Sequence, residues 1–241
     1  LRAEKADLVV QTGLPVGTNL DWVNMTFEDT IAVPTDAWVD WNAETQTFIT
    51  AGEKFPDGLT TKTKSDVYYP ADLYTTVKWH DGSYVSAADF IMYMIMTFDR
   101  SKEASAIYDP DTVGNFDAFL SHFKGVQILS TDPLVIATYD DNYFADAELN
   151  ITSWWPEYGY GNAPWQSIVV GNLADAAGEL AWGTGKADAS ETAEWTSFIG
   201  GPSLAILDKY LDQAIAEVTI PYAPTMGAYI TADDAAARYA G

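Results

Sequence analysis

Histidine is the side chain that most often does acid–base chemistry near neutral pH, and this sequence contains only two, His80 and His122. A hydrolase of the Ser-His-Asp type needs a histidine held beside a nucleophilic serine. The sequence has no G-x-S-x-G motif, no P-loop and no G-x-G-x-x-G dinucleotide motif. We therefore predict no catalytic residue and no cofactor, and we assign structural or solvated roles to both histidines.

The histidines and acidic residues could instead bind a metal ion, and paired carboxylates could hydrolyse a glycosidic bond. A zinc site would need both histidines and a carboxylate to converge. Residues 109–120 begin like a calcium loop, with Asp109, Asp111 and Gly114 at the expected positions, but Val113 and Leu120 occupy positions that need oxygen ligands. We predict a turn there and no metal site. The 35 acidic residues offer many carboxylate pairs, so a carbohydrate hydrolase stays open as an alternative.

The composition limits the classes of partner that this chain can be expected to bind. The chain has 241 residues, 48% of them hydrophobic, and a formal charge of −23. Nucleic acids and anionic lipid surfaces attract clustered lysine and arginine, so this chain should bind neither. It has no cysteine, and no apolar run is long enough to cross a membrane. A negative field favours cationic or zwitterionic ligands, although a solvated acidic coat is the simpler interpretation.

Residues 151–165 are unusually rich in large aromatic side chains, interrupted by Pro156, Gly159, Gly161 and Pro164. Such rings can stack on a peptide or sugar, but tryptophan and tyrosine are equally common as packing residues. This segment is our candidate for ligand contact in a loop. The candidate ligand-binding residues are Trp154, Trp155, Tyr158, Tyr160 and Trp165.

Residues 77–90 combine three local signals. Val77 and Trp79 alternate with polar neighbours, which predicts the end of a strand, and Gly82 follows Asp81 as in a tight turn. Ser86 then stands three residues before Asp89, a spacing typical of a helix N-terminus, and apolar residues recur at helical spacing from Phe90 onward.

Alternation and helical spacing predict further strands and helices along the chain. Alternation predicts short strands at 7–10, 37–42 and 47–50, and a hairpin over 125–139. Trp38 and Trp41 should lie on opposite faces of their strand, so at most one indole should be fully buried. Helical spacing predicts helices at 115–123, 167–181, 191–199, 203–215 and 231–239, the last two beginning near Ser203 and at the Thr231 and Asp234 pair.

The run W-H-D-G-S-x-x-S-A-x-D-F closely resembles the signature of the solute-binding proteins of peptide-type ABC importers, extracytoplasmic family 5. The matching positions are Trp79, Asp81, Gly82, Ser86, Ala87, Asp89 and Phe90. Residues 125–139 resemble the hairpin that follows this signature in the family. The resemblance is specific over about residues 65–140 and faint elsewhere. It implies that the signature residues are architectural and lie away from the ligand.

The resemblance also implies a fold and a function. The expected fold is α+β, with mixed short strands and helices, as part of the larger lobe of a two-lobe periplasmic-binding-protein-like receptor. Residues 1–241 would be a single domain or fragment, with a core at about 65–140, the aromatic loop at 151–165 and a helical part at 166–241. Family members are longer, so the second lobe would be absent and the chain would be a mature or excised piece.

The implied activity is binding without chemistry, so we expect no enzyme. The protein would capture an oligopeptide or related solute outside the cytoplasmic membrane, in the periplasm or at the cell surface, and deliver it to an ABC transporter permease. The full-length form would be a lipoprotein. An oligosaccharide receptor of the same family and a carboxylate-based carbohydrate hydrolase are the alternatives.

Overall fold

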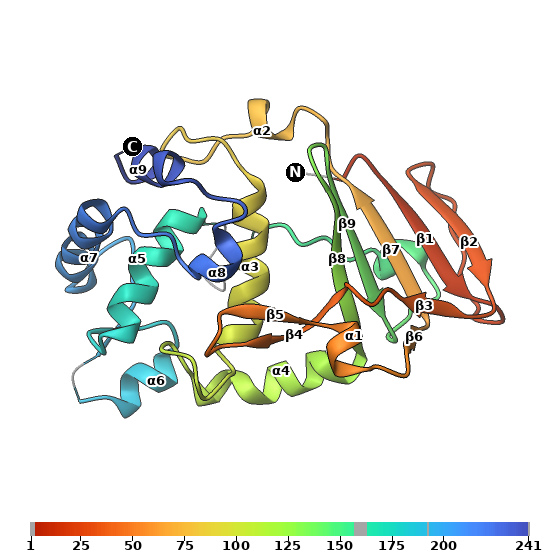
Figure 1. Cartoon of the computed structure of the whole chain (residues 1–241), viewed down its shortest axis with the longest axis horizontal. Coiled ribbons are helices and arrows are strands. Elements are labelled where there is room, and N and C mark those ends of the chain that lie inside the picture. The colour runs from red at the N-terminus through yellow and green to blue at the C-terminus, as the bar shows by residue number, and fades with distance from the viewer. Residues whose placement is uncertain (1–2, 157–162, 192, 241) are drawn as a thin grey trace. The chain divides into compact units, whose positions relative to one another are not determined.

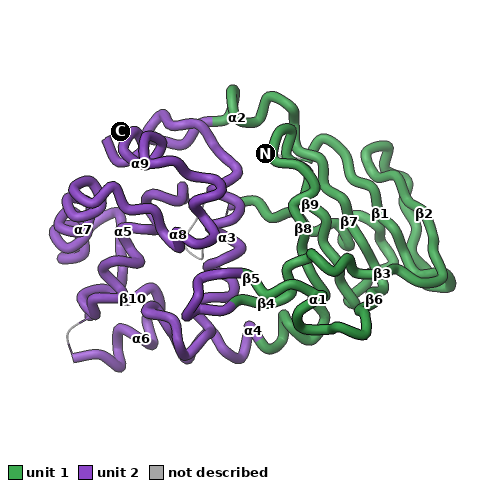
Figure 2. The backbone as a smooth tube through the Cα atoms, in the orientation of Figure 1, with its two compact units in different colours: residues 1–41, 48–77, 117–155 green, residues 42–47, 78–116, 156–241 purple. Residues whose placement is uncertain are grey.

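The computed structural model describes residues 3–156, 163–191 and 193–240, and it has an α+β fold as predicted. The chain forms two compact units (Figure 2). Unit 1 contains residues 1–41, 48–77 and 117–155, and unit 2 contains residues 42–47, 78–116 and 156–241. Residues 65–140, the predicted core, fall partly in unit 1 and partly in unit 2.

Unit 1 is built on a seven-stranded sheet in the order β2-β1-β7-β9-β8-β4-β5 (Figure 1). The β1–β2 pair is parallel, and β1–β7, β7–β9, β8–β9 and β4–β8 are antiparallel. The strands are β1 Lys5–Gln11, β2 Val23–Glu28, β4 Trp38–Asn42, β5 Thr47–Thr50, β7 Thr63–Tyr68, β8 Phe123–Thr131 and β9 Leu134–Asp140. Shorter elements are β3 Ile31–Val33, β6 Leu59–Thr61, α1 Ala51–Lys54, α2 Leu73–Thr76 and the 3-10 helix η1 Ala147–Asn150.

Alternation explains why these segments form strands. In β1, Ala6, Leu8 and Val10 are fully buried while the residues between them are partly exposed, so one face of the strand lies in the core. In β4, Trp41 is 2% exposed and Trp38 is only partly buried, which confirms that one indole of the two is enclosed. The predicted hairpin is β8–β9, paired in antiparallel register from Phe123 and Asp140 to its turn.

Unit 2 is mainly helical. It contains α3 Ala87–Asp99, α5 Trp165–Ala176, α6 Thr184–Ala189, α7 Ser203–Glu217, α8 Ala223–Met226, α9 Ala232–Ala240, the first part of α4 Pro110–His122, and the short strands β10 Leu180–Ala181 and β11 Glu194–Trp195. Helix α3 is buried along most of its length, including Phe90, Ile95 and Phe98. Helices α5 and α7 share an apolar cluster that includes Val170 and Leu207.

Three local predictions were wrong. No strand ends at residues 77–80: α2 ends at Thr76, and only an isolated bridge between Lys78 and Tyr84 remains. The segment 191–199 contains β11 rather than a helix in its described residues, because the backbone at Glu194 and Trp195 pairs with β10. Helix α4 begins at Pro110, five residues before the predicted start.

None of the described helices combines the length and hydropathy needed to span a membrane.

Candidate functional site

The signature residues form a tight turn followed by a helix start in unit 2. Gly82 has a φ of +86°, the left-handed conformation that favours glycine. The carboxylate of Asp81 accepts hydrogen bonds from the Ser83 backbone N–H at 2.8 Å and from the Ser83 hydroxyl at 2.6 Å, which closes the turn. Helix α3 begins directly after Ser86, as the sequence predicted.

Asp89 is the centre of this cluster and is only 1% exposed. Its Oδ2 accepts hydrogen bonds from the Ser86 backbone N–H at 2.8 Å and from the Trp79 indole at 3.2 Å. Its Oδ1 accepts the backbone N–H of Trp165, the first residue of α5, at 2.9 Å. One carboxylate therefore connects the turn, the start of α3 and the start of α5, which is why a short acid suits this position.

Helix α9 closes the same cluster through Arg238. Its guanidinium lies 3.7 Å from Asp89 Oδ2 and donates to the Ser83 hydroxyl at 2.9 Å and to the Tyr84 carbonyl. Gln166 of α5 donates to Asp81 Oδ2 at 2.7 Å. Arg238 and Gln166 were not predicted from the sequence, because residues so far along the chain carry no local signal of this contact.

The electrostatics of the two acids differ. Burial raises the pKa of Asp89, while Arg238 and the hydrogen bonds from Trp165, Ser86 and Trp79 act in the opposite direction. Burial also acts to raise the pKa of Asp81, but the hydrogen bonds from Ser83 and Gln166 outweigh it and hold that pKa below its usual range. Trp79 and Phe90 are 9% and 0% exposed, so packing occupies them too.

The aromatic candidates are distributed over both units. Trp154, in unit 1, is 4% exposed and donates its indole N–H to Thr138 Oγ1 at 2.8 Å. Trp165, in unit 2, is 1% exposed and meets Tyr239 edge to face at 5.6 Å between ring centroids. Packing within each unit accounts for both rings. Trp155 is partly exposed, and the remaining candidates, Tyr158 and Tyr160, lie outside the described residues.

The two histidines belong to different units. His122 contacts the Asp140 carboxylate through Nδ1 at 2.8 Å in unit 1, whereas His80 is exposed in unit 2. Over residues 3–156, 163–191 and 193–240, no three histidine or acidic side chains gather in a way that could hold a metal ion.

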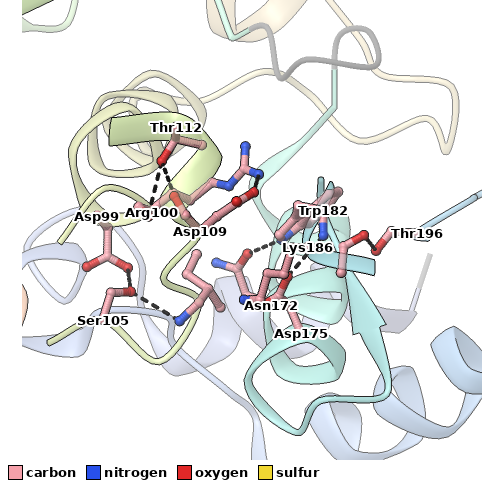
Figure 3. A network of polar contacts seen from close by, with 12 residues as sticks. Asp99, Arg100, Ser105, Asp109, Thr112, Asn172, Asp175, Trp182, Lys186 and Thr196 are labelled. Atoms are coloured by element: carbon pink, nitrogen blue, oxygen red, sulfur yellow. Dashed lines mark hydrogen bonds and ion pairs between the residues drawn. The ribbon is translucent and has the colours of Figure 1, made fainter. Parts of the chain in front are cut away.

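A second polar network lies at the C-terminal end of α3 (Figure 3). Arg100 donates to Asp109 Oδ2 at 2.7 Å, and the other oxygen of Asp109 accepts the Asp111 backbone N–H at 3.1 Å. A Cβ atom at Gly183 would lie 2.5 Å from Asp109 Oδ2, and one at Gly185 would lie 1.8 Å from Asp111 Oδ2. These carboxylates therefore lie against the start of α6. The turn predicted over residues 109–120 is wrong, because α4 already begins at Pro110.

The same network continues along α5 (Figure 3). Asp175 is 3% exposed and accepts hydrogen bonds from Lys186 at 2.5 Å and from the Trp182 backbone N–H at 3.0 Å. Burial raises the pKa of Asp175, and Lys186 opposes that effect. The Trp182 indole donates to Asn172 Oδ1 at 2.9 Å. These contacts fix β10 and α6 against α5.

Described residues of unit 2 line cavities large enough for a small molecule. One has a volume of about 320 Å³ and borders the signature cluster, and its lining includes Asp81, Gln166, Arg238, Phe198 and Leu204. The second has a volume of about 300 Å³ and lies between the end of α3, α5 and residues 219–223. The sequence analysis identified neither cavity, because their walls come from segments far apart in the chain.

Comparison of the sequence with protein-family models and with curated proteins gives no match.

Proposed function

We propose that this protein is the solute-binding component of an ABC importer, which captures an oligopeptide or related solute outside the cytoplasmic membrane and delivers it to the permease. It binds its ligand without chemistry, by closure of two lobes, and it is anchored in its full-length form by a lipid. Its affinity comes from main-chain hydrogen bonds, aromatic faces and charge pairing. An oligosaccharide is the alternative ligand.

The observation that carries the proposal is the way the signature residues are used. Gly82 makes a left-handed turn, Ser86 precedes the first residue of α3, and Asp89 is buried with hydrogen bonds to three segments. Such architectural roles are what the family resemblance implies for these positions. The agreement supports a scaffold of that kind, with ligand contacts elsewhere.

Two further features support binding over hydrolysis. The buried carboxylates Asp89, Asp109 and Asp175 each accept hydrogen bonds and lie beside a cationic side chain, so their geometry serves the scaffold. The lining of the 320 Å³ cavity includes exposed apolar side chains, with Phe198 45% and Leu204 46% exposed. Exposed apolar surface of this kind is typical of interaction sites.

The test is calorimetric titration of the complete gene product and of the 241-residue chain with oligopeptides of two to six residues and with oligosaccharides. Products are analysed by mass spectrometry. Binding of peptides that are recovered intact is the expected result, and binding of intact oligosaccharides would favour the alternative. Cleaved glycan or peptide, or no binding to either form, would refute the proposal.

A pair of variants tests the aromatic contribution. If the segment 151–165 contacts the ligand, Trp155→Ala should weaken peptide binding by about 1–3 kcal/mol, the usual cost of losing an aromatic contact. Trp195→Ala is the matched control, because Trp195 is a 44% exposed indole outside that segment. Equal affinities of the two variants would exclude Trp155 from the ligand site.

A further inference from the structure

The 320 Å³ cavity of unit 2 has an apolar wall to which three helices contribute. Val170 of α5, Leu207 of α7 and Tyr239 of α9 line it and are each 6% exposed. Phe198 and Leu204 also line it, and they are about half exposed. All of the lining residues belong to unit 2. A cavity of this size and composition suits a small organic molecule, and the ring of Phe198 offers it an aromatic surface.

The polar lining includes a carboxylate without a partner. Asp208 is exposed on α7 and makes no hydrogen bond or ion pair with any residue that the structure describes. The lysine next to it in the chain, Lys209, pairs with Glu179 instead. The carboxylate of Asp208 is therefore available to a ligand in the cavity.

Asp81 supplies a second carboxylate to the same lining. Its Oδ1 accepts two hydrogen bonds from Ser83, and its Oδ2 accepts one from Gln166. A carboxylate offers about four acceptor positions, so Oδ2 can accept a further hydrogen bond. Burial acts to raise the pKa of Asp81, but the bonds from Ser83 and Gln166 outweigh it and hold that pKa below its usual range. The carboxylate is therefore ionised at neutral pH.

Arg238 is the cationic side chain among the described lining residues, and its guanidinium is already engaged. It lies 3.7 Å from the buried carboxylate of Asp89. Its other acceptors are the Ser83 hydroxyl, Gln166 Oε1 and the Tyr84 carbonyl. Because Asp89 offsets the charge of Arg238, the guanidinium repels a ligand cation only weakly, and the charge of Asp208 stays unbalanced.

We propose that this cavity binds a small organic cation, with its ammonium group at Asp208 and its apolar body against Phe198 and Leu207. Two carboxylates beside an apolar wall favour a cation over a neutral or anionic ligand of the same shape. The formal charge of −23 acts in the same direction, because it raises the local concentration of cations. The inference concerns unit 2 alone, so it does not depend on the importer role or on the outcome of the peptide titrations.

The first test uses the 241-residue chain and two probes of nearly equal shape, benzylamine and benzyl alcohol, titrated by NMR chemical-shift changes at low ionic strength. We expect benzylamine to bind at least about fivefold more tightly, because only it can pair with a carboxylate. In about 0.5 M salt the difference should fall below about twofold, since the carboxylate is exposed and its charge is screened. Equal affinities at low salt, no detectable binding of benzylamine, or a preference that salt does not reduce would overturn the proposal.

The second test locates the ammonium group. Asp208→Asn keeps the shape of the side chain but removes its charge, so it should weaken benzylamine by about fivefold and leave benzyl alcohol unchanged. Asp188→Asn is the matched control. Asp188 is an exposed aspartate of α6 in the same unit and outside the cavity lining, so its replacement should change either affinity by less than about twofold.

The third test fills the cavity. Ser167 lines it, is partly exposed, and its hydroxyl has no hydrogen bond to the described residues, so Ser167→Phe can enlarge the side chain without breaking a contact. Binding of both probes should be lost, and a melting curve checks the folding of each variant. Benzylamine affinity that is unchanged in a folded Asp208→Asn or Ser167→Phe variant would overturn the proposal.

Discussion

Replacement of Asp89 by alanine should be one of the most destabilising single changes in unit 2. The carboxylate is 1% exposed and accepts the backbone N–H groups of Ser86 and Trp165 and the indole N–H of Trp79. Alanine would leave these three donors buried without an acceptor. It would also leave the Arg238 guanidinium without the carboxylate 3.7 Å away.

The magnitude follows from the number of groups affected. An unsatisfied buried donor costs about 1–3 kcal/mol, so three donors set an upper range of roughly 3–9 kcal/mol. Relief of the desolvation that raises the pKa of Asp89, and movement of the freed donors toward water, reduce that sum. Loss of one partner of a buried ion pair typically costs about 3–5 kcal/mol, and we expect a value in that range.

The assay is urea unfolding at neutral pH, followed by tryptophan fluorescence and circular dichroism. Asp234→Ala is the matched control. Asp234 occupies the equivalent position at the start of α9, where it accepts the Thr231 backbone N–H at 3.1 Å, but it is exposed. Loss of this exposed helix-start contact should cost only about 0.5–2 kcal/mol.

Comparison of the two variants distinguishes a buried connecting role of Asp89 from a simple role at the helix start. The difference between them should be at least about 1 kcal/mol, because only Asp89 leaves buried donors behind. If Asp89→Ala costs no more than Asp234→Ala, Asp89 is merely a helix-start residue and the connecting role assigned to it is wrong.

Three other substitutions test the packing, the helix content and the electrostatics of the chain. The hydrogen bond from the Tyr68 hydroxyl to Asp7, together with burial, raises the pKa of Tyr68 to about 12, so its contribution to stability is complete below about pH 10 and is lost as the pH rises through 12. Tyr68→Phe should therefore be less stable than the wild type at about pH 8, and the gap should close in alkaline unfolding curves; a gap independent of pH would contradict the assignment. Gly171→Ala should destabilise by about 1–3 kcal/mol in urea unfolding, because the new Cβ would lie 2.2 Å from the Trp182 ring. Gly114→Ala, with nothing within 4 Å of its Cβ, should instead stabilise α4 by about 0.5–1 kcal/mol, and a loss of stability there would show that α4 is not helical at that point.

Local features were predictable because their energetics are local. The turn at Gly82 and the helix starts after Ser86 and Thr231 each depend on residues within four positions of one another. The α1 start, where Glu53 accepts the Thr50 backbone N–H at 2.7 Å, has the same spacing and could have been predicted by the same rule. Alternation likewise predicted β1, β4 and the β8–β9 hairpin.

Predictions failed where distant segments compete with local preference. Residues 77–80 alternate like a strand, but they follow helix α2 directly and form only one bridge, between Lys78 and Tyr84. Glu194 and Trp195 lie in a segment with helical spacing, yet pairing with β10 satisfies their backbone. Residues 77–80 therefore lack the pairing that a strand needs, whereas at Glu194 and Trp195 tertiary hydrogen bonding outweighs a weak helical propensity.

The sequence by itself determined an α+β chain, a strongly acidic one, with a turn at Gly82 and a helix beginning after Ser86. Only the tertiary structure revealed that Asp89 is buried against Arg238 and α5, and that Asp208 lines a cavity. The physical reason is that turns and helix starts are made by neighbours in the chain, whereas burial and cavities are made by segments that meet only after folding.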